Sequence, residues 1–220
     1  PRFLDVGCGP GIALDVAQAL GCSTTGLDPN KGVLERLTAK GHETIQGTLS
    51  DAMTDRLAVF RCPWDIVCAY EVLEHHPCPE ALLLRCYDIM APGGILLLAV
   101  PNDFNPYQLL ARTVLHLPPW WVSVPEHLHY FTPKTLQLLV RRCGFEILDM
   151  RGTYPIDRHL TEGNNYIGDD RLGRAVHEAR MQEELAVAAS GAWEDREAEY
   201  RYNLGACRTG REILVMARKL

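Results

Sequence analysis

The sequence lacks the features that mark several large classes of protein. No apolar run approaches the roughly 20 residues that a helix needs to cross a bilayer, so we expect no membrane span. No secretory signal peptide is recognisable, and no internal repeat or low-complexity tract is present. With 47% hydrophobic and 23% charged residues among 220, the composition is that of an ordinary soluble protein.

Positive charge is also scarce. Lys and Arg number 22 against 28 Asp and Glu, which gives a formal net charge of −6. Non-specific attraction to nucleic acid is therefore not expected. No Cys-x-x-Cys pair occurs among the eight cysteines, several of which lie in apolar patterns. We expect buried free thiols in a reducing cytoplasm rather than a zinc site or disulfides.

The hydrophobic pattern alternates between the period of a strand and that of a helix. The expected strands are Phe3–Val6, Ser23–Leu27, His42–Gln46, Asp65–Tyr70, Ile95–Val100, Phe145–Met150 and Glu212–Ala217. The expected helices between them are Ile12–Leu20, Lys31–Lys40, Pro79–Met90 and Thr132–Cys143, with a turn at Pro92–Gly94. This alternation predicts an α/β fold, with helices on both faces of a parallel sheet.

The stretch before the last strand differs in character. It is charged and alanine-rich, and it predicts helices at Asp169–Ala189 and Ala192–Leu204. We interpret residues 1–220 as a single domain, with a cofactor-binding core (1–153), a helical insertion or lid (154–210) and a final strand (211–220). Because the chain begins inside its first strand, we expect that N-terminal helices precede it and are missing here.

Two segments are candidates for the substrate side. An aromatic, proline-rich loop at 105–130 contains Trp120 and Trp121, which either form the wall of a pocket for an apolar substrate or pack the loop against the sheet. The insertion starts with polar side chains that we expect to be mostly solvated. These are Arg158, His159, Asn164, Asn165 and Tyr166.

Three glycines directly follow the first strand. Gly7, Gly9 and Gly11 let the backbone bend sharply and let a ligand approach it, as in nucleotide-binding loops. Their Gly-x-Gly-x-Gly spacing departs from the Gly-x-Gly-x-x-Gly of nicotinamide dehydrogenases, which remain an alternative. Asp28 directly follows the expected second strand, at a position where an acidic residue can bind a ribose diol.

Five motifs in order resemble the class I S-adenosylmethionine-dependent methyltransferases. They are LDVGCGPG, GLDPN, WDIVCAYEVLEHHP, APGGILLLAVPN and CGFEILDM. The resemblance covers roughly Pro1 to Met150, together with the last strand. It implies a Rossmann-like, doubly wound, seven-stranded sheet, mostly parallel with an antiparallel last strand, and S-adenosylmethionine as the methyl donor.

The resemblance also implies a set of cofactor-binding residues. The set is Asp5, Gly7, Gly9, Gly11, Asp28, Pro29 and Tyr70. The glycines would approach the methionine and ribose portions, Asp5 would orient the loop, and Asp28 would accept both ribose hydroxyls. The loop around Thr48–Asp51 would lie at the edge of the adenine.

The segment EVLEHHP after the fourth strand is rich in titratable groups. Glu71, Glu74 and His75 lie at positions i, i+3 and i+4, which share one face of a helical turn. Such a face can bind a divalent cation or take a proton from a hydroxyl, whereas a structural or cofactor-pocket role is the third possibility. The pattern resembles quinone-biosynthesis O-methyltransferases and small-RNA 2′-O-methyltransferases. The latter add a later histidine, for which His129 fits better than His127.

The residues therefore define two overlapping sets of candidates. The catalytic set is His75, His129 and Glu71, and the metal set is Glu71, Glu74, His75 and His129. The function we expect is that of a cytoplasmic methyltransferase acting on oxygen or nitrogen of a small molecule, with S-adenosylhomocysteine as product. The alternatives are a metal-assisted RNA 2′-O-methyltransferase, which the acidic balance disfavours, and a non-catalytic cofactor-binding partner subunit, which the intact glycine loop disfavours.

Overall fold

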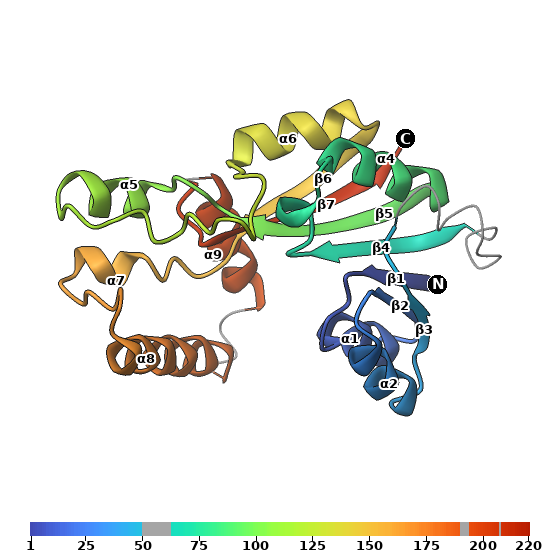
Figure 1. Ribbon diagram of the computed structural model, residues 1–220, viewed down its shortest axis with the longest axis horizontal. Coiled ribbons are helices and arrows are strands. Elements are labelled where there is room, and N and C mark those ends of the chain that lie inside the picture. The colour runs from blue at the N-terminus through green and yellow to red at the C-terminus, as the bar shows by residue number, and fades with distance from the viewer. Residues whose placement is uncertain (50–62, 190–193, 207) are drawn as a thin grey trace. The chain divides into compact units, whose positions relative to one another are not determined.

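The computed structural model describes residues 1–49, 63–189, 194–206 and 208–220 (Figure 1). Within them, seven strands form one sheet in the order β3-β2-β1-β4-β5-β7-β6. The strands are β1 (Arg2–Val6), β2 (Ser23–Asp28), β3 (Glu43–Gln46), β4 (Trp64–Tyr70), β5 (Met90–Pro101), β6 (Phe145–Gly152) and β7 (Glu212–Lys219). The helices are α1 (Ile12–Ala19), α2 (Lys31–Ala39), the 3-10 turn η2 (Leu73–His75), α4 (Pro79–Ile89), α5 (Pro106–Thr113), α6 (Pro133–Arg142), α7 (Arg158–Thr161), α8 (Asp170–Ala189) and α9 (Glu194–Ala206).

The strand order creates a switch point at β1. This strand pairs in parallel with β2 on one side and β4 on the other, and β2–β3 and β4–β5 are also parallel pairs. Figure 1 shows β7 running against the direction of β5. The predicted α/β, Rossmann-like, doubly wound sheet with a reversed last strand is therefore confirmed. Ligands of such sheets bind beyond the carboxyl ends of the strands beside the switch point.

One predicted turn lies inside a strand instead. Strand β5 begins at Met90 and continues through Pro92–Gly94, where we expected a turn before a strand at Ile95. The register with β4 is irregular there, because Trp64 faces Met90 whereas Ile66 faces Ile95. The extra residues form a bulge, which the apolar pattern alone does not separate from a turn.

Two short helices were not predicted from the hydrophobic period. Helix α5 lies within the segment interpreted as an aromatic loop, and α7 lies within the expected solvated loop. A start signal for α5 is nevertheless present in the sequence. The Asn105 side chain accepts hydrogen bonds from two backbone N–H groups, Pro106 follows it, and Gln108 completes a capping box.

The described chain forms two compact units. The first comprises Pro1–Val100, Lys134–Asp149 and Val215–Leu220, and the second comprises Pro101–Pro133 and Met150–Leu214. The first unit contains the glycine loop and the part of the sheet around the switch point. The single domain with boundaries after residues 153 and 210 remains a prediction. Among the described residues, no helix combines the length and apolar character needed to span a bilayer.

The core of the first unit explains how the glycine loop is held. Helix α1 buries Leu14 and Ala17 against β1 and β2, and α2 buries Leu34 and Leu37 in the same cluster. Burying a leucine side chain contributes about 2 kcal/mol. The two helices therefore hold in place the loop that joins β1 to α1.

The thiols of the described residues are free, as expected from the sequence. Cys8, Cys68, Cys86 and Cys143 are buried. Cys22 is half-buried and Cys78 is exposed. The other two cysteines, Cys62 and Cys207, lie outside the described residues.

The second unit has a polar interior around one carboxylate. Asp157 is buried, and it accepts hydrogen bonds from Asn105 (3.0 Å), Gln108 (3.2 Å) and Tyr166 (3.1 Å). These bonds join α5 to the residue just before α7. A buried carboxylate of this kind costs little because donors from three side chains satisfy it.

The polar side chains at the start of the insertion are only partly solvated. Asn164 and Asn165 are exposed, as expected, whereas Arg158, His159 and Tyr166 are half-buried. For Trp120 and Trp121, the structure favours the interpretation that they pack within the protein over the interpretation that they form the wall of a substrate pocket. The ring of Trp121 is buried, with its centroid 4.9 Å from that of Trp120.

Candidate active site

The three glycines after β1 all adopt left-handed backbone conformations. Their φ angles are 69° at Gly7, 45° at Gly9 and 82° at Gly11, a region that side chains other than glycine disfavour. At Gly7, a Cβ would lie 2.6 Å from the Val72 side chain, so this glycine also permits close packing. At Gly9, by contrast, no described heavy atom lies within 4 Å of a Cβ position. The backbone of Gly9 is therefore a point of the loop that a ligand can approach.

Asp28 connects this loop to the end of β2. One carboxylate oxygen accepts the N–H of Gly9 at 3.0 Å, and the other accepts the N–H of Asn30 at 2.8 Å. The N–H of Gly7 donates to the Leu27 carbonyl at 2.7 Å, which adds a second tie between the loop and β2. Each Asp28 oxygen retains a lone pair beyond these bonds, so it can still accept a hydroxyl. The sequence motif did not indicate that Asp28 would hold the loop as well as face a ligand.

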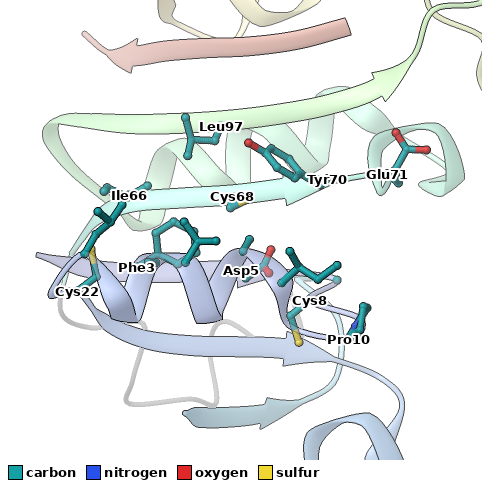
Figure 2. Close-up of a pocket in the computed structure, with 17 residues that line it drawn as sticks. Phe3, Asp5, Cys8, Pro10, Cys22, Ile66, Cys68, Tyr70, Glu71 and Leu97 are labelled. Atoms are coloured by element: carbon teal, nitrogen blue, oxygen red, sulfur yellow. The ribbon is translucent and has the colours of Figure 1, made fainter. Parts of the chain in front are cut away.

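A pocket of about 730 Å³ lies between the glycine loop, α1 and the neighbouring strands β1 and β4 (Figure 2). Figure 2 shows Asp5, Tyr70 and Glu71 toward one end, and Ile66, Cys22 and Leu97 toward the other. Apart from Asp5 and Glu71, the described lining is uncharged, and it includes no Lys, Arg or His. The pocket thus suits a ligand that is partly apolar and carries positive charge.

Asp5 is an acid of the pocket whose pKa is strongly perturbed. Its side chain is buried, and this burial raises its pKa from 3.8 to about 7. The Cys68 thiol donates a hydrogen bond that opposes the rise, whereas the negative charge of Asp28 adds to it. Burial likewise raises the pKa of Cys8 to about 12 and that of Tyr70 to about 12. Among the described groups that shift the pKa of Asp5, none is a cation that would offset the effect of burial.

The segment after β4 does not form the helical face expected from its spacing. Glu71 lies before the 3-10 turn with a φ of 55°, and its N–H donates to Ala99 at 2.9 Å. Glu74 is fully buried, whereas His75 is exposed. The His75 ring and the Glu74 carboxylate are 4.0 Å apart. The chain turns at Glu71, so the i, i+3, i+4 argument does not apply to this residue.

His129 and His127 belong to the second unit, where His129 lies near Phe131 and His127 near Tyr130. The catalytic and metal sets, which combine His129 with residues of the first unit, therefore remain predictions.

Two further parts of the predicted cofactor site are Pro29 and the loop around Thr48–Asp51, which was expected at the edge of the adenine and is only partly described. Pro29 is exposed, and its carbonyl accepts a hydrogen bond from Gln46 at 3.4 Å. Thr48 is exposed as well. Ser50 and Asp51, the other part of that expectation, lie outside the described residues.

Comparison with known proteins identifies the family. A family model described as a methyltransferase domain matches residues 1–150. The ubiquinone biosynthesis O-methyltransferase of Pseudomonas aeruginosa (strain LESB58) is 30% identical over 175 residues, which cover 74% of this chain and 73% of the relative. The family is thus supported over most of the chain, and the named reaction is that of the relative.

Solved structures agree on the fold. An S-adenosylmethionine-dependent methyltransferase from Archaeoglobus fulgidus superimposes with a TM-score of 0.60 at 17% identity, covering 99% of this chain and 86% of the other. The [4+2]-cyclase SpnF gives 0.54 at 22% identity, covering 99% and 75%. A protein titled as a cyclase thus shares the architecture, so the fold alone does not define the reaction. The motifs and the matching family model show that the chain belongs to the methyltransferase-domain family and is an S-adenosylmethionine-dependent methyltransferase.

Proposed function

We propose that the protein transfers a methyl group from S-adenosylmethionine to an oxygen or nitrogen atom of a small molecule. The observation that carries this proposal is the open space beside the Gly9 backbone, whose N–H donates to Asp28, in a pocket whose described lining includes two acids and no cation. The relatives named as ubiquinone biosynthesis O-methyltransferases support a small-molecule acceptor.

The first unit fits this cofactor at four points. Gly9 leaves room for the ligand to contact the backbone, and Asp28 retains lone pairs for a ribose diol. Asp5 and Glu71 supply negative charge in a pocket that is otherwise largely apolar. Tyr70, which lines the same pocket, offers an aromatic face. When bound, the cofactor supplies a methyl group already activated by a sulfonium.

The protein therefore has two tasks, alignment and the exclusion of water. The Gly7–Gly11 loop and Asp28 hold the donor in one orientation, so that the acceptor can approach the methyl group in line. A hydroxyl acceptor must also lose its proton. In our proposal His75 accepts this proton, because it is exposed beside the buried Glu74 carboxylate. Glu71 and His129 complete the proposed catalytic set.

A divalent cation at Glu71, Glu74, His75 and His129 is a separate hypothesis. The positive φ of Glu71 removes the shared helical face on which the sequence argument rested, so the proposed reaction is derived without a metal. The cation hypothesis predicts that a chelator lowers activity and that Mg²⁺ or Zn²⁺ restores it. Activity and melting temperature that ignore both treatments would exclude it.

The donor is tested by thermal shift with S-adenosylhomocysteine and with NAD in parallel. We expect stabilisation by the former alone, because ligands that bind the folded state raise its melting temperature. Stabilisation by NAD alone would overturn the proposal.

The acceptor is tested by a methyl-transfer screen. It should include quinone-like phenols, amines, carboxylates and a short RNA. We expect transfer to a phenol or an amine. Transfer to RNA alone would favour the 2′-O-methyltransferase alternative, and binding of the donor without transfer to any acceptor would favour a non-catalytic subunit.

A further inference from the structure

Asp5 has no positively charged partner in the described lining of the pocket, and this affects how the pocket binds a charged ligand. Asp5 is buried at the wall of the pocket, so its carboxylate is poorly solvated by water. A buried carboxylate without a positive partner is costly, and the carboxyl responds by holding its proton. A ligand that brings positive charge into the pocket removes this cost.

The groups that face Asp5 from the surrounding elements are neutral or negative. Cys8 comes from the glycine loop and Asp28 from the end of β2. Cys68 and Tyr70 come from β4. The pKa values of the Cys8 and Cys68 thiols and of the Tyr70 phenol are all raised. Glu71, which also lines the pocket, is a further acid. The described lining therefore offers Asp5 no cation, and a ligand would be the first one.

We propose that cofactor binding is coupled to the proton of Asp5. The Asp5 carboxyl releases its proton to solvent when the positively charged donor enters, and it takes a proton back once transfer has removed that charge. This inference rests on the proposed function, and it makes Asp5 the residue by which the site distinguishes donor from product.

The chemistry of transfer supplies the difference in charge. The acceptor's electron pair forms the new bond to the methyl carbon, and the electrons of the carbon–sulfur bond remain on sulfur. The sulfur of the product is therefore neutral, while the amino and carboxyl groups are unchanged. Donor and product differ by one positive charge, which interacts strongly with a carboxylate in a poorly solvated site.

The expected size follows from the ionisation of Asp5. Its pKa of about 7 leaves the carboxyl largely protonated at about pH 6 and largely ionised at about pH 8. If only the ionised form accepts the donor, donor affinity rises about tenfold across this range, the ratio of the two ionised fractions. The product, which lacks the sulfonium charge, should show a smaller change.

The experiment is isothermal titration calorimetry of the whole chain with S-adenosylmethionine and S-adenosylhomocysteine between pH 6 and 8. Repeating it in buffers of different protonation enthalpy gives the protons released. At pH 7 we expect the wild type to release about half a proton on binding the donor, and fewer on binding the product. This measurement needs no variant.

Two variants identify the group. Asp5→Asn should abolish the pH dependence and reduce the preference for the donor, whereas Glu35→Gln, an equal change on the exposed face of α2, should keep both. Cys68→Ala removes the hydrogen bond that lowers the pKa of Asp5, so it should move the midpoint of donor affinity to higher pH. A purely structural role of Cys68 would not move this midpoint.

The outcomes separate this inference from the proposed function. If neither ligand binds at any pH, the proposed function fails. If both bind but the ratio of their affinities is independent of pH, or if Asp5→Asn retains the dependence, the coupling to Asp5 is refuted while the proposed function stands.

Discussion

Replacing Gly9 by alanine should separate the binding role of the glycine loop from its role in folding. The added methyl group would project into the space where no described heavy atom lies within 4 Å of the Cβ position. It would clash with no part of the described protein, and it would meet only a ligand that contacts the loop. Gly21, which follows α1, has a φ of 83° and equally open surroundings, but it does not line the pocket. Gly21→Ala is therefore the matched control.

The two substitutions should have a similar effect on stability. Each places a Cβ in the left-handed region, at a cost of about 1 kcal/mol in the free energy of unfolding. For a chain of this size, that corresponds to a fall of about 3 °C in melting temperature. Equal falls in the two variants would confirm that both glycines are needed for their backbone conformation.

Their effect on binding should differ. In Gly9→Ala, the methyl group displaces the cofactor from the loop by about 1 Å, which typically costs about 100-fold in kcat/KM. In Gly21→Ala, kcat/KM should match the wild type. The assays are methyl transfer and calorimetry with S-adenosylhomocysteine. Equal affinity of the two variants for S-adenosylhomocysteine would refute the placement of the cofactor against Gly9.

Three further changes test other parts of the structure. Asp28→Asn can accept only one of the two backbone N–H groups now bound to the carboxylate. The free energy of unfolding measured in urea should therefore fall by about 1–3 kcal/mol, and calorimetry should show weaker cofactor binding. Unchanged values in both assays would contradict the dual role of Asp28. Asn102→Ala removes the amide that donates to the carbonyls of Arg208 (2.9 Å) and Gly210 (2.8 Å) in the second unit. The free energy of unfolding should fall by about 2 kcal/mol. A fall of only about a few tenths of a kcal/mol would show that water replaces those bonds. Asp5→Asn should raise stability at alkaline pH. The folded-state pKa of Asp5 lies above its ordinary value, so the folded wild type binds more protons than the unfolded chain and loses stability as the pH rises from about 4 to about 7. An amide at this position does not titrate and does not share this loss. Parallel stability–pH curves for wild type and Asp5→Asn would count against this explanation.

The sequence was most informative where local geometry and function require the same residue. The alternation of strand and helix periods predicted the sheet, and its clearest signals were the apolar runs within β4 and β5. Gly7, Gly9 and Gly11 predicted the loop because only glycine readily adopts its φ angles. The spacing of these glycines then distinguished the cofactor class, and the family comparison agrees with it.

The prediction was less accurate where tertiary contacts decide the conformation. The argument for Glu71, Glu74 and His75 assumed a helix, but Glu71 is fixed by its bond to the neighbouring strand at Ala99, which spacing cannot reveal. The bulge at Pro92–Gly94 depends likewise on the register between two strands. Helix α5 was missed because the helix buries Gln108 as well as Ala111, so its buried face is partly polar.

The two hydrogen bonds of Asp28 bear on the entropy of ligand capture. Because its carboxylate already fixes the N–H groups of Gly9 and Asn30, the loop has its binding conformation before any cofactor arrives. Little conformational freedom is left for the ligand to remove, so ordering this loop takes little from the free energy of binding. The aspartate thus prepares the loop for the molecule that it is itself proposed to bind, and a cofactor leaving after turnover leaves behind a loop that needs no refolding.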